Sequence, residues 1–353
     1  MSFRMLQYFE GVPDFFADAE KDDFEILKTL KKPTLIRLKG KSSGEALFVS
    51  CLIHGDEESG WKAVRAFLGQ PTACAWDLYF SIGNIPAALW GKGHEQRVVP
   101  PDGEDYNRCW DIEQATGPLA KSARELLDFL KTKKLRGSLD IHNTTGRNPP
   151  FCVIADSNEA LLTLASQFSD RIIHSPLNGT LTRAMGDLCP SLTVECGIRG
   201  EKSSEEVAKK SLKRFLEIFG APTRPTLERK EYRLFKDPER VLIPKEISIG
   251  VEGESSEPRD FMIARGLDRF NFNRVPPGTL LGTLRSPERE LPFRHKNPNS
   301  PLPTNSRLID TYFRKEGNRV VSKAPFTPIM MSLSERAIHL DCFFYLGESP
   351  LGE

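Results

Sequence analysis

Short apolar runs alternate with stretches of helical spacing along the first part of the chain. The runs are typical of buried β-strands and lie at 46–53, 77–82, 137–141, 151–155, 171–174 and 191–196. Other stretches repeat apolar residues every three or four positions, which predicts amphipathic helices at 117–134, 158–168 and 203–220. Strands that alternate with helices predict an α/β fold with a mixed, mostly parallel sheet flanked by helices.

The pattern changes after Gly220. The segment APTRPTLERKEY (221–232) is broken by prolines and rich in charge, and no convincing long helix follows it. Short β-like runs separated by glycine and proline follow instead, among them RVLIP, ISIGVEG, PPGTLLGTL and NRVVS. We therefore expect two domains, an α/β domain at 1–225 and a smaller β-rich domain at 226–353. The earlier basic run at 31–41 is most simply a solvated strand edge or turn.

Composition narrows the class of protein. The 353 residues are 39% hydrophobic and 27% charged, and the net charge of +1 argues against a nucleic-acid partner. No apolar segment approaches the length of a membrane span, and the N-terminus lacks the order of a signal peptide. We therefore expect a soluble, cytoplasmic protein. The seven scattered cysteines contain no CxxC motif, so we expect buried free thiols.

The first cluster of chemically versatile residues follows the apolar run at 46–53. The segment CLIHGDEESG places His54 and Glu57 one turn past that predicted strand, where open α/β sheets bind their ligands. Their spacing lets an imidazole and a carboxylate converge on one ion, and both suit zinc. Asp56 and Glu58 are rival ligands, which we assign instead to the first turn of the following helix. Alone, this pair is weak evidence, because exposed loop histidines beside acids are common.

A second strand end strengthens the case for a metal. GSLDIHNTTG places Asp140, His142 and Asn143 at the close of another apolar run, and the chain has only six histidines. His54, Glu57 and His142 therefore form a candidate two-histidine, one-carboxylate zinc site. Such a site leaves the fourth metal position for water, as catalytic zinc requires.

The third strand end offers a base. SLTVECGIRG places Glu195 directly after an apolar run, where its carboxylate can take a proton from a metal-activated water and return it to a leaving amine. A salt-bridged edge glutamate is the alternative interpretation, and it would be preferred without the other two strand ends.

The loop between the first two clusters carries candidate substrate ligands. The segment IGNIPAALWGKGHEQRVVPPDGEDYNRCW contains Arg97, Asn107 and Arg108, and an arginine fork matches a carboxylate at two points. Loop arginines are usually solvated, but the position between two zinc-site segments favours a clamp for a substrate carboxylate. His94, among charged neighbours, is expected to be solvated.

The ordered motifs resemble a known family. HGDE, then N-P-A within NIPAAL, Arg97, YNRCW, DIHNTT and VECG are similar to the succinylglutamate desuccinylase/aspartoacylase family, a branch of the zinc carboxypeptidase superfamily. The resemblance spans about residues 46–200, and PPGTLLG (276–282) is similar to a weaker pattern of the family's β-domain. The DIHNTT segment is closer to aspartoacylases than to digestive-type carboxypeptidases.

The resemblance implies roles for individual residues. It implies one zinc ion per chain on His54, Glu57 and His142, with Glu195 as general base. It implies that Arg97 polarises the scissile carbonyl. A final set of three residues is implied to grip acidic groups of the substrate: Asn107, Arg108 and, through the TRAM segment (182–185), Arg183. The spacing from Arg183 to Glu195 is longer than in the aspartoacylase pattern. The β-rich domain is implied to cap the active site.

These observations predict a zinc-dependent hydrolase that cleaves the amide bond of a small N-acyl amino acid. A carboxypeptidase acting on short or cell-wall-derived peptides is the nearest alternative, since it needs the same metal set and clamp. A non-catalytic relative that binds acyl amino acids or a protein partner is an alternative of another class. Neither a nucleic-acid nor a membrane partner is expected, and homo-oligomerisation stays open.

Overall fold

The chain divides into two compact units in a computed structural model. The larger unit comprises Met1–Asn143 and Pro150–Leu234, and the smaller unit comprises Thr144–Pro149 and Phe235–Glu353. The segment Thr144–Pro149 interrupts the larger unit in sequence but belongs to the smaller one, and the hydrophobic pattern gives no sign of this. The structure describes residues 3–18, 21–42, 44–101, 103–113, 115–223, 225–255, 257–296 and 306–347.

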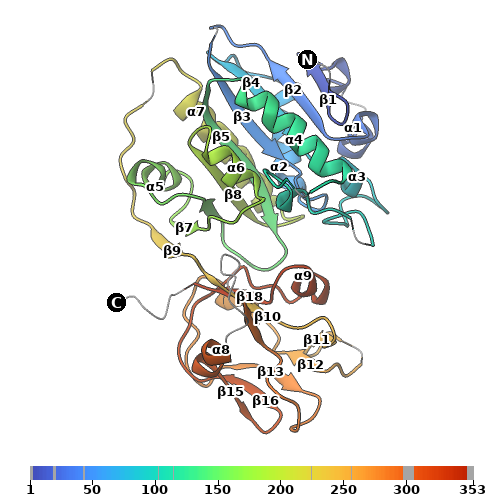
Figure 1. Cartoon of the computed structure of the whole chain (residues 1–353), viewed down its shortest axis with the longest axis vertical. Helices are drawn as coiled ribbons and strands as arrows, with labels where there is room; N and C mark the ends of the chain where they lie inside the picture. Colours follow the sequence, from blue (N-terminus) through green and yellow to red (C-terminus); the bar gives the residue numbers. More distant parts are fainter. Residues whose placement is uncertain are drawn as a thin grey trace. The chain divides into compact units, whose positions relative to one another are not determined.

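A nine-stranded sheet forms the centre of the larger unit (Figure 1). Its strands, in spatial order, are β1 (Gln7–Glu10), β2 (Thr34–Leu38), β4 (Asp77–Ile82), β3 (Ala46–Cys51), β5 (Leu135–Thr144), β8 (Ser191–Ile198), β6 (Phe151–Ile154), β7 (Arg171–His174) and β9 (Arg233–Lys236). The pairs β1–β2, β3–β4, β3–β5 and β6–β7 are parallel, whereas β2–β4 and β6–β8 are antiparallel. The predicted mixed, mostly parallel sheet is confirmed.

Helices cover both faces of this sheet, which explains the unbroken apolar runs of its inner strands. In β3, Leu47 and Val49 pack into the core cluster that holds apolar residues of α2 and α7, while Phe48 packs into the cluster of α4 and α6. The helices of this unit are α1 (Asp23–Leu30), α2 (Glu58–Gly69), α3 (Ile85–Ala88), α4 (Pro118–Lys131), α5 (Glu159–Ala165), α6 (Leu181–Gly186) and α7 (Lys202–Phe219), with short 3₁₀ turns η1 (Asp14–Phe16) and η2 (Tyr106–Arg108). The three predicted helices correspond to α4, α5 and α7.

The basic run at 31–41 is not a solvated edge. Its central residues form β2, which pairs with both β1 and β4, and Leu35 and Ile36 are fully buried. Arg37 remains near the surface because it pairs with Asp77 at 2.6 Å and Glu10 at 2.8 Å. Because lysines flank β2, the sequence pattern did not identify it as an interior strand.

The smaller unit is β-rich, as predicted. One sheet has the order β14 (Arg294–Lys296), β10 (Glu239–Leu242), β18 (Phe344–Leu346), β17 (Pro328–Ile329); the other has β11 (Ile249–Val251), β12 (Phe261–Ile263), β13 (Leu280–Leu284), β16 (Arg319–Ser322), β15 (Phe313–Glu316). Three short helical segments accompany them: η3 (Leu267–Phe270), α8 (Ser306–Tyr312) and α9 (Glu335–Leu340). Its core contains edge-to-face aromatic pairs such as Phe261–Phe293 and Phe313–Phe326. Across the described ranges of both units, no helix combines the length and apolarity needed to cross a membrane.

Candidate metal centre

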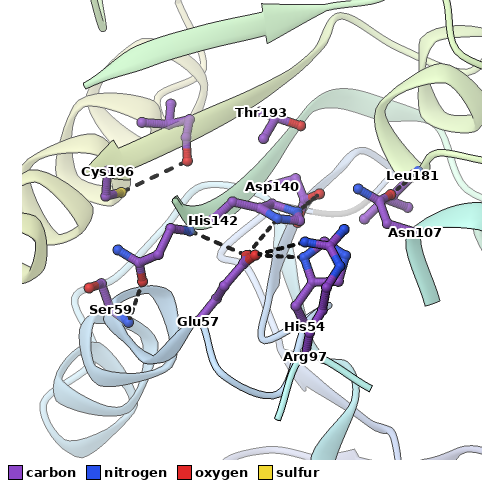
Figure 2. A network of polar contacts seen from close by, with 12 residues as sticks. His54, Glu57, Ser59, Arg97, Asn107, Asp140, His142, Leu181, Thr193 and Cys196 are labelled. Carbon is purple, nitrogen blue, oxygen red and sulfur yellow. Dashed lines mark hydrogen bonds and ion pairs between the residues drawn. The ribbon is translucent and has the colours of Figure 1, made fainter. Parts of the chain in front are cut away.

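Three side chains meet at the carboxyl ends of neighbouring parallel strands. His54 follows β3, Glu57 directly precedes α2, and His142 lies near the end of β5. Nδ1 of His54 lies 2.7 Å from Oε1 of Glu57, and Nδ1 of His142 lies 2.7 Å from Oε2 of the same carboxylate. Figure 2 shows both imidazole rings turned toward Glu57. The structure thus brings together the three residues that the sequence nominated as metal ligands, and all three are buried.

The far nitrogen of each imidazole is held by another carboxylate. Nε2 of His54 lies 3.1 Å from Asp105, and Nε2 of His142 lies 2.7 Å from Asp140. An Nε2–H donated to these acids would leave each Nδ1 lone pair facing Glu57. The possible ligand atoms of the three residues all lie within 4.8 Å of one another. A set of two oriented imidazoles and one carboxylate fits a zinc-type ion.

The charges of the cluster are strongly coupled. Burial opposes ionisation of Glu57, but the imidazoles of His54 and His142 outweigh burial and hold the pKa of this carboxyl well below its usual range. Burial also opposes protonation of His142, yet Asp140 and Glu57 raise its pKa well above the ordinary value. Without a metal, protons on the imidazoles therefore balance the buried carboxylates. A divalent cation would neutralise the carboxylates in place of these protons, so metal binding should release protons.

Glu195 lies on β8, opposite Phe151 of β6, and is 8% exposed. Burial raises the pKa of its carboxyl to about 8; His142 opposes this increase and Glu57 adds to it. Within the described part of the chain, its Oε2 has no hydrogen-bond partner. The ionisation of Glu195 is therefore coupled to that of His142 and Glu57. A carboxyl with a raised pKa suits proton transfer near neutral pH.

Arg97 also reaches the metal-site residues, together with Asp105, an acid for which the sequence predicted no role. Its guanidinium lies 3.7 Å from Glu57 and 3.2 Å from Asp105. Asp105 accepts a hydrogen bond from the backbone N–H of Asn107 at 2.8 Å, which fixes its carboxylate at the start of η2. Burial opposes its ionisation, but His54 and Arg97 hold the pKa of Asp105 below its usual range. One acid among several in an irregular loop gave no sequence signal.

The three predicted substrate ligands have different surroundings. Oδ1 of Asn107 accepts a hydrogen bond from the backbone of Leu181 at 2.9 Å, and the Arg108 guanidinium donates to the Asn107 carbonyl at 2.8 Å. Arg183 instead pairs with Asp187 at 2.7 Å and lines a cavity of about 1140 Å³. The described contacts of the Arg183 guanidinium do not reach the histidines, so the structure does not join it to the cluster.

Asn143 connects the segments that carry the cluster. Its backbone N–H donates to Oε2 of Glu57 at 3.2 Å. Its side-chain oxygen accepts from the backbone of Ser59 in α2 at 3.0 Å, and its side-chain nitrogen donates to the carbonyl of Gly197 at 3.1 Å. The sequence placed Asn143 beside His142 but gave it no role. Its contacts link β5, α2 and the end of β8.

Two neighbouring residues differ from their predicted settings. Asp56 lies before α2, not in its first turn, and pairs with Arg199 at 2.6 Å while remaining 6% exposed; Glu58 does begin the helix. His94 is half-buried, because its Nδ1 bonds to the carbonyl of Gly55 at 2.9 Å. A side chain at Gly55 would approach the backbone of α3 to 2.4 Å, so the loop after β3 is closely packed.

One protein-family model matches part of the larger unit. Residues 43–176 match the succinylglutamate desuccinylase/aspartoacylase catalytic domain, a range that includes His54, Glu57 and His142 but ends before Glu195. No protein of curated function matches the chain.

Solved structures share the fold at low sequence identity. A succinylglutamate desuccinylase/aspartoacylase from Rhodobacter sphaeroides has a TM-score of 0.58 at 16% identity, over 88% of this chain and 87% of that chain. The product-bound ectoine utilization protein EutE (DoeB) from Ruegeria pomeroyi has a TM-score of 0.58 at 16% identity, over 89% and 88%. A succinylglutamate desuccinylase from Silicibacter sp. TM1040 has a TM-score of 0.54 at 15% identity, over 84% and 82%.

Proposed function

This chain belongs, through the catalytic domain at residues 43–176, to the succinylglutamate desuccinylase/aspartoacylase family, and we propose that it is a zinc-dependent deacylase of N-acyl amino acids. The observation that carries the proposal is the convergence of two buried imidazoles on one carboxylate, with Glu195 nearby. The products would be a carboxylic acid and a free amino acid.

His54, Glu57 and His142 would hold the metal in this proposal. A zinc ion there would lower the pKa of its bound water to about 7 and polarise the scissile carbonyl. Asp105 and Asp140 would keep the two imidazoles in the tautomer that presents Nδ1.

The other residues would bind the substrate and transfer protons. Glu195 would accept a proton from the attacking water and deliver it to the leaving nitrogen. Arg97, beside Glu57, would donate hydrogen bonds to the oxygen that becomes negative during attack. Asn107 and Arg108 would grip the substrate carboxylate and orient the amide.

Two finer assignments are part of the proposal. Arg183 would bind a second acidic group of the substrate only if its pair with Asp187 opened, and the β-rich unit would limit substrate size as a cap. A cytoplasmic location is supported by the seven cysteines, all of which are free thiols.

The test is a liberated-amine assay of the zinc-loaded protein. N-acetyl, N-succinyl and N-formyl amino acids would be compared with short peptides, using His142→Ala as the metal-site control. We expect turnover of at least one acyl amino acid and none by the control. Turnover confined to peptides would indicate a carboxypeptidase and contradict the deacylase proposal. Binding without turnover would indicate a non-catalytic relative.

A further inference from the structure

A cavity of about 640 Å³ in the larger unit is lined by thirteen residues, of which five carry positive side chains. We call it the basic cavity and define it by its five cations: Arg171, Lys210, Lys213, Arg214 and Lys230. Two carboxylates, Asp170 and Glu217, also line it. None of the residues lining it belongs to the metal cluster.

The two carboxylates are already paired. Asp170 binds Arg171 at 2.6 Å, and Glu217 binds Arg214 at 3.3 Å. The three lysines have no ion-pair partner within the ranges that the structure describes. The cavity therefore holds an excess of positive charge on a chain whose net charge is only +1.

The cations converge from separate segments, and neighbouring contacts fix these segments. On α7, Lys210, Lys213 and Arg214 share one face because they are three and four residues apart. The backbone N–H of Lys230 donates to the Ser166 hydroxyl at 3.1 Å, which attaches the linker to the end of α5.

Gln167 also holds together the segments that line the basic cavity. Its side-chain nitrogen donates to the carbonyl of Glu228 at 2.7 Å, and its side-chain oxygen accepts from Arg214 at 3.0 Å. Phe168 and Val207 supply half-buried apolar surface within the same cavity. The buried Nε of Arg171 has no hydrogen-bond partner among the described residues.

We propose that the basic cavity binds a small metabolite carrying two phosphate groups and an apolar or aromatic part. Phosphate oxygens accept hydrogen bonds from ammonium and guanidinium groups. Five cations against two carboxylates leave an excess of three positive charges, which one dianionic phosphate does not balance and two phosphate groups do. The apolar surface favours an organic phosphate over the inorganic ion. The site is independent of the proposed deacylase activity.

The probe is adenosine 3′,5′-bisphosphate, titrated calorimetrically into the zinc-loaded protein at low salt. Two control ligands are titrated in the same way: adenosine, which lacks the phosphate groups, and inorganic phosphate, which lacks the organic part. We expect the bisphosphate to bind at least tenfold more tightly than either, and its affinity to fall as ionic strength rises. Equal binding of adenosine would refute the charge argument, and equal binding of inorganic phosphate would refute the role of the apolar surface.

The double variant K210E/K213E should weaken bisphosphate binding at least tenfold. Lys209→Glu is the matched control, because Lys209 lies on the same helix but pairs with Glu206 at 3.2 Å and does not line the cavity. Lys230→Glu, on the linker, tests the same cavity should the helix variant fail to fold. Unchanged affinity in K210E/K213E or in Lys230→Glu, or an equal loss in the control, would overturn the proposal.

A last measurement separates the cavity from the metal centre. His142→Ala should bind the bisphosphate as the wild type does, whether or not the protein proves to be a deacylase. Loss of binding in this variant would place the ligand on the metal and refute the cavity site.

Discussion

The backbone N–H of Asn143 donates a hydrogen bond to Oε2 of Glu57, the oxygen that also contacts His142. A neighbour of one candidate ligand thereby fixes the orientation of another. The Asn143 side chain is bonded to Ser59 and Gly197, so the donor itself is held in place. The geometry of Glu57 therefore depends on three segments at once.

Asn143→Ala should weaken zinc binding about tenfold, because it keeps the N–H but loses the contacts that hold it. It should also lower the free energy of unfolding by about 1–3 kcal/mol, since buried groups of Ser59 and Gly197 lose their partners. Competition with a chelator and thermal unfolding measure the two effects. An unchanged zinc affinity would show that Asn143 is only a structural bridge.

His54→Ala and His142→Ala should each abolish stoichiometric zinc binding, because each removes one of three ligands. Metal analysis after dialysis would be compared with the wild type and with His339→Ala, a histidine on α9 in the smaller unit. Undiminished zinc in the two ligand variants would reject this site.

Glu195→Gln should retain zinc but lose turnover by roughly 10²- to 10⁴-fold, since an amide of the same shape cannot accept the proton. The ratio of zinc to protein and the value of kcat, measured on the same preparation, check both parts. Wild-type kcat in this variant would make Glu195 a structural residue.

The pH dependence of unfolding should report Glu195 in the metal-free protein. Its pKa rises on folding from 4.5 to about 8, so the folded state binds the extra proton. The stability that this proton provides is complete below about pH 4.5 and is lost as pH rises through about 8. Relative to Glu195→Gln, the wild type should lose stability between pH 5 and 9. Parallel Tm curves would contradict the raised pKa.

Arg108→Ala should damage recognition of a carboxylate more than folding. A charge-assisted contact of this kind contributes about 1.5–3 kcal/mol, so kcat/KM should fall roughly 10- to 150-fold. An analogue with that carboxylate amidated, already a poor substrate, should lose little further. Proportional losses on both compounds would show that Arg108 does not touch the carboxylate.

The sequence predicts best those features that depend on a single strand or helix, such as its bounds. The bounds of β4 and β7 agree with the apolar runs, because strands covered on both faces need uninterrupted apolar residues. The pairing of His54, Glu57 and His142 was predictable because the carboxyl ends of adjacent parallel strands meet at one edge. β2 was missed because its flanking lysines resemble a surface turn.

Residues positioned by irregular loops could not be predicted. Asp105 reaches His54 from a loop whose path depends on tertiary contacts, and periodicity carries no information about such a path. His94 similarly bonds to Gly55 from a loop that looks solvated in sequence. Arg183, on α6, pairs with Asp187, and its role in binding a second acidic group stays a prediction.

The loop Thr144–Pro149 has a consequence for the order in which the protein can fold during synthesis. It belongs to the smaller unit, where Asn271 donates to the Arg147 carbonyl and Asn148 accepts from the backbone of Met330. Because synthesis proceeds from the N-terminus, this loop leaves the ribosome before Asn271 and Met330 have been synthesised. The stretch directly after His142 and Asn143 therefore acquires its contact with Met330 only when translation is nearly complete.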